Sequence, residues 1–494
     1  MNSQVRRVVI AGGGTSGWIT AAALAKQLGP LLDITLVESE TIGTIGVGEA
    51  TIPTQRTFHQ LIGLDEAEFM RATQATFKLG IAFENWAREG DRYIHSFGAI
   101  GRSPWMTHFL AVWLEARARG MGRGLDAYCA ELLAAEAGLF STEGKPPLNY
   151  AYHLDATAYA AHLRALSEAA GVRRREGLIE TVERDPGTGD ISALLLDDGE
   201  RVEGDLFIDC TGFRALLIED ALGAGFEDWG HWLPTDRAIA MQTSATGDPL
   251  PYTRAIAHDA GWRWRIPLQR RVGNGIVYSS DDLSDDEAER RLREAVEGDP
   301  LTEPRRIRYA TGRRRAVWAQ NCIALGLSSG FVEPLESTSI HLVQIAVTRL
   351  IKLFPFGGIT PAIRARYNDM ARVELERIRD FIILHYKLTE RDDSSFWRDR
   401  RDMDVPDSLK ERIALFREHG HAYQGPEDLF QPDSWIQVML GQRLEPESRH
   451  RIGGMMSDAQ LRGVLDGLER RAAAAIGGLP THAAFLDRYC RAAS

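Results

Sequence analysis

The first forty residues carry the feature that most limits the fold of this chain. An apolar run over 8–11 leads into a glycine-rich turn over 12–17, and a helical pattern follows over 18–28. A second apolar run, 34–37, ends at the acidic Glu38. Strand, glycine turn, helix and strand in this order predict a dinucleotide-binding βαβ unit in a parallel sheet.

The glycines of this turn have separate physical roles in such a unit. Gly12 permits the tight turn, Gly14 lets a pyrophosphate approach the backbone, and Gly17 lets the helix and the strand pack closely. The helix start attracts phosphate, and Glu38 is placed to accept hydrogen bonds from ribose hydroxyls.

A later segment favours FAD over NAD as the dinucleotide. Residues 205–213 read as a buried strand that runs into a glycine turn, after a meander broken at 186–187 and 197–199. Folds of the FAD monooxygenase type interrupt their nucleotide domain in this way, although an ordinary central strand also fits. No second GxGxxG opens another βαβ unit, which suggests that reduced flavin comes from a separate protein.

Bulk properties exclude several classes of function. A net charge of -11 argues against a nucleic-acid-binding surface. No run of about 18 apolar residues occurs, so we expect no membrane span. The four cysteines form no CxxC or Cys/His cluster, which predicts reduced thiols, a cytoplasmic location and no metal site.

The rest of the chain alternates between β-rich and helical patterns. The expected elements are a helix over 156–170 capped by Asp155, a β-rich stretch over 225–280 with turns at Gly261 and 273–275, short strands near 305–325, a helix over 339–353, and helices from Thr360 onward. The fold class is α/β, with an FAD-binding Rossmann-like body of the flavin monooxygenase type. We expect residues 1–352 to form this body, with a β-rich insert at about 225–300, and residues 353–494 to form a helical substrate-binding part.

Two tryptophans lie one residue apart in the run Trp262-Arg-Trp264-Arg-Ile266-Pro267. On a strand both indoles point to one face, and Pro267 ends the pairing just beyond them. Ordinary core packing explains such a pair, and so does a rigid wall that seals a cavity.

Separated motifs then combine into a specific pattern. They are the Phe-Lys-Leu-Gly of 77–80, the tryptophan run of 262–267, the Phe-Val-Glu-Pro-Leu-Glu-Ser-Thr of 331–338 and the Gly-Val-Gly-Glu-Ala-Thr-Ile-Pro of 46–53. Together with the glycine-rich opening, and over about residues 6–450, the chain resembles the two-component, FADH2-dependent tryptophan/indole halogenases. In that family a flavin hydroperoxide reacts with halide, and hypohalous acid reaches a lysine beside the aromatic substrate.

The resemblance implies two catalytic residues. Lys78 would donate a charge-assisted hydrogen bond to hypohalous acid, or be N-halogenated, although a snorkelling surface lysine is the common alternative. Glu336 would polarise the halogenating species and take the ring proton, although an acid also favours a helix N-terminus. Ser337 or Thr338 is expected to cap the helix that follows.

Binding residues follow from the same resemblance. The cofactor set is Gly12, Gly14, Thr15, Ser16, Gly17, Glu38, Ala50, Ile179, Leu327 and Ile340; the halide pair is Thr338 and Ser339; the substrate set is His95, Phe97 and Trp435; and the partition wall is Trp262, Trp264, Ile266 and Pro267. Many family members have Thr-Gly where this chain has Thr338-Ser339, so chloride and bromide both stay open.

The C-terminal part departs from tryptophan-specific members, which hold the amino-acid backbone with two tyrosines and a glutamate. The comparable stretch here reads Trp435-Ile436, followed by Gln442 and Glu445. A site without buried partners for ammonium and carboxylate binds free tryptophan poorly. We therefore expect an indole-type small molecule without the zwitterion, a separate flavin reductase as partner, and an assembly for which a homodimer is one option.

Two other functions remain open from the sequence. A flavin-dependent aromatic hydroxylase would deliver oxygen directly, but it needs its substrate beside the flavin and needs no lysine relay. A flavin-binding module without enzymatic activity would make the same residues mere packing.

Overall fold

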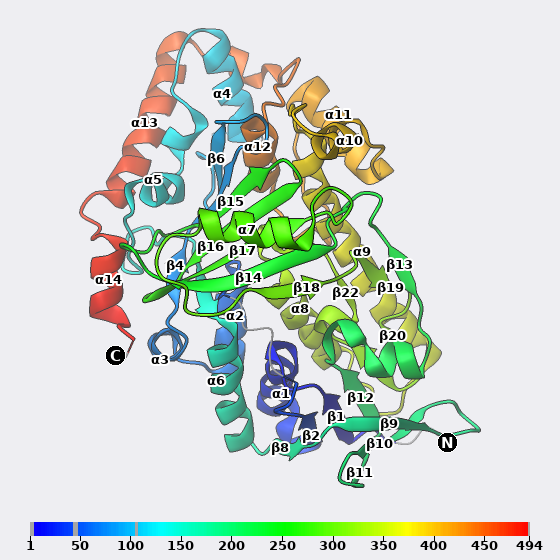
Figure 1. Ribbon diagram of the computed structural model, residues 1–494. Coiled ribbons are helices and arrows are strands. Elements are labelled where there is room, and N and C mark those ends of the chain that lie inside the picture. The colour runs from blue at the N-terminus through cyan, green and yellow to red at the C-terminus, as the bar shows by residue number, and fades with distance from the viewer. Residues whose placement is uncertain (1–3, 43–47, 104–106, 493–494) are drawn as a thin grey trace.

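The glycine-rich opening forms the centre of a mainly parallel sheet in the computed structural model, which describes residues 4–42, 48–103 and 107–492 (Figure 1). In spatial order its strands are β20 (Trp318–Ala319), β21 (Cys322–Ala324), β12 (Leu206–Asp209), β1 (Arg7–Ala11), β2 (Asp33–Glu38) and β8 (Arg173–Glu176). Only β20 runs antiparallel to its neighbour. The predicted βαβ unit and the strand predicted at 205–213 are both confirmed.

Close backbone contacts explain the glycines of the turn. A side chain at Gly12, where φ is +105°, would lie 2.4 Å from the carbonyl oxygen of Cys210 on the neighbouring strand. One at Gly17 would lie 1.9 Å from the carbonyl oxygen of Gly12. The helix α1 (Thr15–Leu28) can therefore start directly against the sheet.

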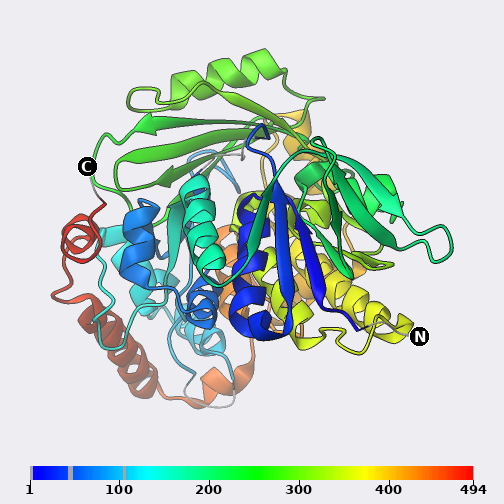
Figure 2. The same ribbon diagram turned by 90° about the horizontal axis from the view of Figure 1, so that it is seen from below.

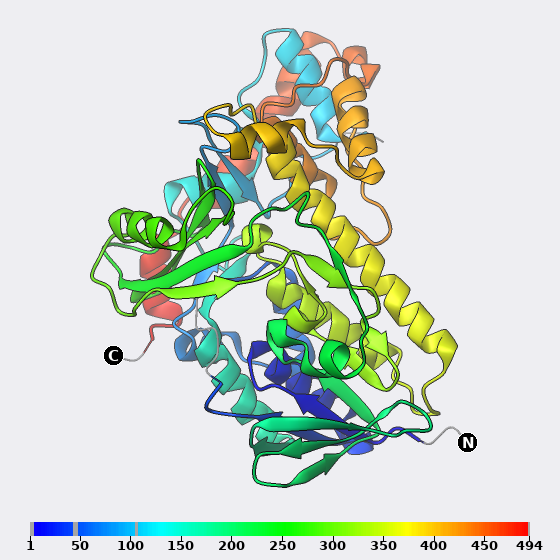
Figure 3. The ribbon, with the colours of Figure 1, turned by 45° about the vertical axis from the view of Figure 1, so that its right-hand side comes forward.

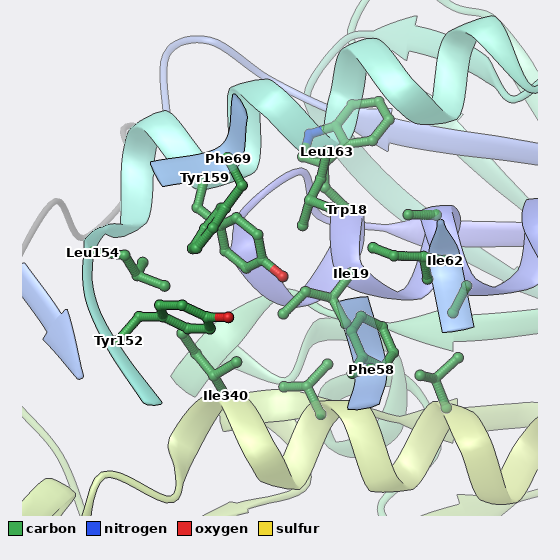
Figure 4. Packing of buried hydrophobic residues seen from close by; sticks show 14 of the residues in the cluster. Trp18, Ile19, Phe58, Ile62, Phe69, Tyr152, Leu154, Tyr159, Leu163 and Ile340 are labelled. Carbon is green, nitrogen blue, oxygen red and sulfur yellow. The ribbon is translucent and has the colours of Figure 1, made fainter. Parts of the chain in front are cut away.

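Apolar side chains cover both faces of the parallel sheet, as expected for parallel strands. On one face α1, α2 (Thr54–Ile62), α6 (Ala156–Ala169) and α8 (Ser339–Lys352) pack together, and Figure 4 shows Trp18 and Ile19 of α1 among side chains from the other three. On the opposite face Val9 packs with the meander of β9 (Ile179–Arg184), β10 (Ile191–Leu196) and β11 (Arg201–Glu203). Asp155 caps α6 as predicted, because its side chain accepts a hydrogen bond from the backbone N–H of Ala158.

A second, seven-stranded sheet lies over the first. Its strands, in spatial order, are β18 (Arg305–Arg308), β14 (Arg237–Ser244), β17 (Arg271–Tyr278), β16 (Gly261–Pro267), β15 (Thr253–His258), β5 (Gly80–Glu84) and β6 (Arg92–Ser96). Figure 2 shows its strands β14 to β18 in green, with α7 (Asp285–Ala295) on their outer side. The predicted β-rich stretch is confirmed, and two strands from the first hundred residues join it.

The turn predicted at 273–275 is wrong, because these residues lie inside β17. Gly275 is the direct neighbour of Trp264 on β16. A side chain at Gly275 would come within 2.0 Å of the Trp264 ring, so the glycine makes room for an indole rather than for a turn.

Two small sheets complete the strands. They are β3 (Gly48–Ala50), β7 (Ala151–Asp155) and β4 (Thr76–Lys78) in one, and β13 (Phe226–Asp228), β19 (Gly312–Arg314) and β22 (Gly330–Phe331) in the other. The first brings Lys78 beside the seven-stranded sheet, because β5 begins two residues later.

Helices dominate from residue 361 onward, as predicted. They are α9 (Pro361–Lys387), α10 (Ser395–Asp402), α11 (Asp407–His419), α12 (Pro432–Gly441), α13 (Asp458–Ile476) and α14 (His482–Tyr489), and the earlier helices are α3 (Glu66–Ala72), α4 (Phe109–Ala118) and α5 (Ala130–Ala137). Figure 3 shows α9 as a long helix that joins the parallel-sheet side to the group of α10, α11 and α12.

The division into two domains at 352 stays a prediction. Within the described ranges, every helix is too short or too polar to cross a lipid bilayer.

Gly275→Ala tests the fit between β17 and the Trp264 indole. We expect it to lower the free energy of unfolding by about 1–3 kcal/mol, the usual cost of overpacking a core. Urea unfolding of the purified variant measures this. Gly247→Ala is the control, because that glycine is exposed and has open space around it. Equal stability of the two variants would show that Trp264 moves aside freely.

Candidate active site

A cavity of about 890 Å³ lies between the glycine-rich turn, the seven-stranded sheet and the segment that leads into α8. Nine of the ten predicted cofactor residues line it, namely Gly12, Gly14, Thr15, Ser16, Glu38, Ala50, Ile179, Leu327 and Ile340. The tenth, Gly17, serves the packing of α1 instead. The volume is in the range of sites for large organic ligands.

The cavity residues fit a dinucleotide. Among the residues that the structure describes, no side chain caps the start of α1 and no acid lies in its first turn, which leaves its backbone N–H groups available to an anion. A side chain built at Gly14 would meet nothing within 4 Å, which leaves that approach open. The two features together suit the pyrophosphate of FAD.

Glu38 is held in place at the end of β2. Its Oε1 accepts a hydrogen bond from Arg174 Nε at 2.5 Å, and its Oε2 accepts one from Trp18 Nε1 at 3.3 Å. Each carboxylate oxygen has a further lone pair for a ribose hydroxyl.

The tryptophan run forms one side of the cavity. Trp262, Trp264 and Ile266 line it from β16, and the two indole rings lie 6.1 Å apart at an angle of 56°. Trp262 is 2% exposed and Trp264 is 9% exposed. Pro267 is the last residue of β16, as predicted, and is not among the cavity-lining residues.

Glu333, a buried acid that the sequence analysis did not single out, holds the Trp262 indole in place. Glu333 Oε2 accepts a hydrogen bond from Trp262 Nε1 at 3.0 Å and another from the Tyr386 hydroxyl. Burial raises the pKa of Glu333, and the two donors oppose that effect. The residue stands in the 331–338 motif, but its partner on α9 lies 53 residues away in sequence.

Lys78 is completely buried on β4. Its Nζ donates to the carbonyl oxygen of Thr51 at 3.1 Å and to Ser337 Oγ at 2.8 Å. Burial lowers the pKa of Lys78 to about 7, although the charge of Glu336 acts in the opposite direction. This lysine therefore changes charge near neutral pH.

The strand that carries Lys78 is tied to the C-terminus. The backbone N–H of Phe77 donates to His482 Nε2 at 3.1 Å, and His482 Nδ1 donates to the carbonyl oxygen of Pro249 at 2.8 Å. This arrangement needs a neutral ring, and burial lowers the pKa of His482 to about 4. The first residue of α14 thus anchors the residue next to Lys78.

Glu336 lies between two buried histidines. His95 Nδ1 is 2.9 Å and 3.0 Å from its two carboxylate oxygens, and His385 Nε2 is 2.9 Å from Oε1. Burial alone would raise the pKa of Glu336, but the charge of His95 and the hydrogen bonds of both histidines lower it to about 2. His385 escaped the sequence analysis, because nothing in the helical pattern of α9 marks it.

Ser337 connects the cavity to the buried pair, Lys78 and Glu336. It lines the cavity and hydrogen-bonds Lys78, whereas Lys78 and Glu336 are not among the cavity-lining residues. Thr338, one of the two residues expected to cap α8, occupies its N-cap position, but its side chain makes no capping hydrogen bond. Ser337 instead adopts a left-handed conformation, with φ at 59°, and its hydroxyl accepts the hydrogen bond from Lys78.

The predicted halide pair is divided between two environments. Ser339 lines the cavity at the start of α8. Thr338 is fully buried, and within the described part of the chain its Oγ1 has no hydrogen-bond partner. Both lie at an uncapped helix start, which attracts anions.

Aromatic side chains surround the buried pair. The ring of Phe97 lies 5.3 Å from Lys78 Nζ, and His95 contacts Glu336 directly. Trp435 of α12 packs edge-on against Phe381, 4.8 Å between ring centres, and Phe381 lies 5.6 Å from His95. Phe381 therefore connects two of the predicted substrate residues, His95 and Trp435, whereas Phe97 lies near Lys78. Of the motif at 46–53, Gly46 and Val47 lie outside the described residues.

Comparisons with known proteins agree with this site. The family model described as Tryptophan halogenase matches residues 7–458. The chain is 41% identical over 440 residues to tryptophan 6-halogenase SttH of Streptomyces toxytricini, covering 83% of this chain and 84% of that protein. It is 38% identical over 443 residues to tryptophan 7-halogenase RebH of Lentzea aerocolonigenes, covering 84% and 83%.

Solved structures extend the match to the C-terminus. The flavin-dependent halogenase Xcc4156 from Xanthomonas campestris superimposes with a TM-score of 0.98 at 54% identity and full coverage of both chains. The flavin-dependent halogenase BrvH from Brevundimonas sp. BAL3 gives a TM-score of 0.94 at 46% identity, with 99% of each chain covered. The chain therefore belongs to the tryptophan halogenase family and is a flavin-dependent halogenating enzyme, as its motifs predict.

Proposed function

We propose that this enzyme uses FADH2, O2 and chloride or bromide to form hypohalous acid, and transfers the halogen to an indole-type substrate through Lys78 and Glu336. The observation that carries the proposal is the position of Ser337, which faces the cavity and hydrogen-bonds the buried lysine. Bound in the cavity as FADH2, the flavin would supply two electrons that reduce O2 to the peroxide level, and this oxygen would oxidise halide to hypohalous acid.

Lys78 and Glu336 divide the transfer step between them. The protonated Lys78 Nζ donates a hydrogen bond to the oxygen of hypohalous acid. A ring carbon of the substrate forms the bond to halogen while the oxygen–halogen bond breaks, and the leaving hydroxide takes a proton from Lys78 to become water. The ring carbon then loses its proton to a carboxylate oxygen of Glu336, which restores the aromatic ring.

The other site residues bind the cofactor, the halide and the substrate, or separate the substrate from the flavin. The uncapped starts of α1 and α8 bind the cofactor phosphates and the halide, the latter beside Thr338 and Ser339. Trp262 and Trp264 keep the organic substrate away from the flavin. His95, Phe97 and Trp435 orient the indole by stacking and edge contacts.

The substrate class follows from what surrounds α12. Glu445 is bound to Arg117 at 3.1 Å, with more than half of its side chain exposed, and Gln442 Nε2 donates to the carbonyl oxygen of His385. Neither residue is left to hold an amino-acid backbone in a buried site. These contacts support indole or a substituted indole over free tryptophan. The enzyme would receive FADH2 from a separate flavin reductase in the cytoplasm, as a monomer or a homodimer.

The central test supplies the purified protein with FAD, a flavin reductase, NADH, O2 and bromide, with indole and tryptophan in parallel. We expect bromoindole by mass spectrometry, and faster conversion of indole than of tryptophan. Chloride in place of bromide ranks the two halides. An oxygenated product that forms without halide would identify the hydroxylase instead and refute the proposal.

Lys78→Met is expected to reduce halogenated product at least about a hundredfold, within the range that general acids contribute. FAD binding should be unchanged, because Lys78 is not a cavity-lining residue. Lys352→Met, at the exposed end of α8, is the matched control. Wild-type product yield in Lys78→Met would remove the lysine from the mechanism.

The pH dependence tests the same residue independently. With a pKa of about 7, Lys78 is protonated below neutral pH and loses its proton above it. Since the protonated form donates to hypohalous acid, the rate of halogen transfer should fall as pH rises through about 7. Product formation from added hypobromous acid, without flavin, measures this step alone. A rate that keeps rising above pH 8 would contradict the assignment.

Two variants separate the roles of Trp262. Trp262→Ala should lower halogenated product per FADH2 consumed by at least about tenfold, the ratio that 1.4 kcal/mol represents. Trp262→Phe, which keeps a ring but loses the hydrogen bond to Glu333, should give an intermediate ratio. A melting curve for each variant checks folding, with Trp232→Ala as a half-buried control. Unchanged coupling in both variants would leave the indole with a packing role only.

A further inference from the structure

The two ring nitrogens of His385 indicate where protons reside in the site. His385 lies in the last turn of α9 and is completely buried. Its Nδ1 is 2.8 Å from the carbonyl oxygen of Phe381. A carbonyl oxygen only accepts, so Nδ1 must carry a hydrogen and donate it.

The other ring nitrogen then faces a carboxylate. His385 Nε2 lies 2.9 Å from Glu336 Oε1. In the neutral ring with hydrogen on Nδ1, Nε2 bears only a lone pair, and a lone pair and a carboxylate oxygen repel each other at this distance. One of these two atoms, Nε2 or Oε1, must therefore carry a proton.

We propose that this proton resides on Nε2, so that His385 is an imidazolium cation that holds Glu336 as a carboxylate. His385 is then a positioning residue, because it acts on the substrate only through Glu336. The contact is bent away from an ideal hydrogen bond, so charge attraction contributes most of it.

The surroundings of His385 offer Glu336 as its only charged contact among the described residues. Aromatic rings enclose it, with Phe83 at 4.7 Å, Phe381 at 5.3 Å and Trp86 at 6.1 Å between ring centres. Gln442, which directly follows α12, donates its side-chain hydrogen bond to the backbone carbonyl of His385 and not to the ring. A buried carboxylate without a cationic partner is strongly destabilised, so the pair stabilises both charges.

Other titratable groups face Glu336 rather than His385. From β6 they are His95, which donates to both carboxylate oxygens, and Tyr93, whose pKa burial raises well above its usual value. From β4 it is Lys78, which reaches the neighbouring Ser337. None of them replaces a donor at Oε1 on the α9 side.

The consequence for catalysis rests on the proposed function. Glu336 takes the ring proton only if it is ionised when the substrate ring is halogenated. His385 keeps it ionised and fixes Oε1, which leaves a free lone pair of the carboxylate for the incoming proton. Without His385, burial shifts the carboxyl towards its protonated form, which cannot act as a base.

Nitrogen-15 NMR of the full-length protein, labelled at histidine, tests the protonation state without any halogenation assay. At about pH 7.5 we expect both His385 nitrogens to give signals of a protonated imidazolium. His341 and His482, whose pKa values burial lowers to about 4, supply neutral reference signals in the same spectrum. His385→Gln assigns the resonances by their disappearance.

In the Glu336→Gln variant we expect a neutral His385 in place of the imidazolium. The amide group of glutamine can donate to Nε2, so His385 should become neutral with its hydrogen on Nδ1. A neutral His385 in the wild-type protein at this pH would overturn the proposal. Because this readout needs no turnover, a protein that fails to halogenate but shows the imidazolium refutes the proposed function alone.

Kinetics supply the functional half of the test. His385→Gln should lower kcat at least about tenfold with KM for indole nearly unchanged, since Glu336 acts on the proton and not on binding. In this variant the rate should increase with pH over a range that lies at higher pH than in the wild type. The reason is that a larger fraction of Glu336 becomes ionised as the pH rises. His419→Gln, on the exposed end of α11, is the control. An unshifted pH profile together with wild-type kcat would remove His385 from this role.

Discussion

The structure depends on keeping Glu336 charged while it is shut away from water. A carboxylate that is 1% exposed is stable only if cations and hydrogen-bond donors surround it closely. His95 comes from the seven-stranded sheet and His385 from the end of α9, so the two parts of the chain must pack accurately for the charge to exist at all. The requirement for a dry pocket and the requirement for a base are met by the same packing.

One short segment connects this charge to the flavin cavity. Within 331–339, Glu333 binds the Trp262 indole, Glu336 binds the two histidines, and Ser337 binds Lys78. His385 and Tyr386 are consecutive on α9, and each holds one of these two glutamates. A shift of α9 would thus disturb the contacts of Trp262 and of Glu336 together, which couples the proposed partition wall to the proposed base through one helix.

Local sequence patterns predicted much of the fold, because the decisive signals were short-range. The glycine-rich turn and the helix over 339–352 follow from residue spacing, and the helix over 156–169 follows from its Asp155 cap. The turn expected at 273–275 failed because a glycine pair can also serve a neighbouring indole, and the neighbour of Gly275 comes from another strand.

The candidate site was predictable only where a motif marks it. Lys78 and Glu336 stand in recognisable motifs, and the structure brings them to either side of Ser337, while their catalytic roles stay proposals. His385 and Tyr386 stand in a plain helical pattern, and their meaning comes from partners about fifty residues away. Burial and charge pairing of this kind arise from tertiary packing, which no local pattern encodes.

The hydrogen bond from the Phe77 backbone to His482 spans 405 positions of the chain. During synthesis the N-terminal strand leaves the ribosome long before its partner, since chains emerge at about 5–20 residues per second. The strand that carries Lys78 therefore lacks one of its anchors until His482 has left the ribosome. A chain interrupted before residue 482 would therefore lack this hydrogen bond beside Lys78.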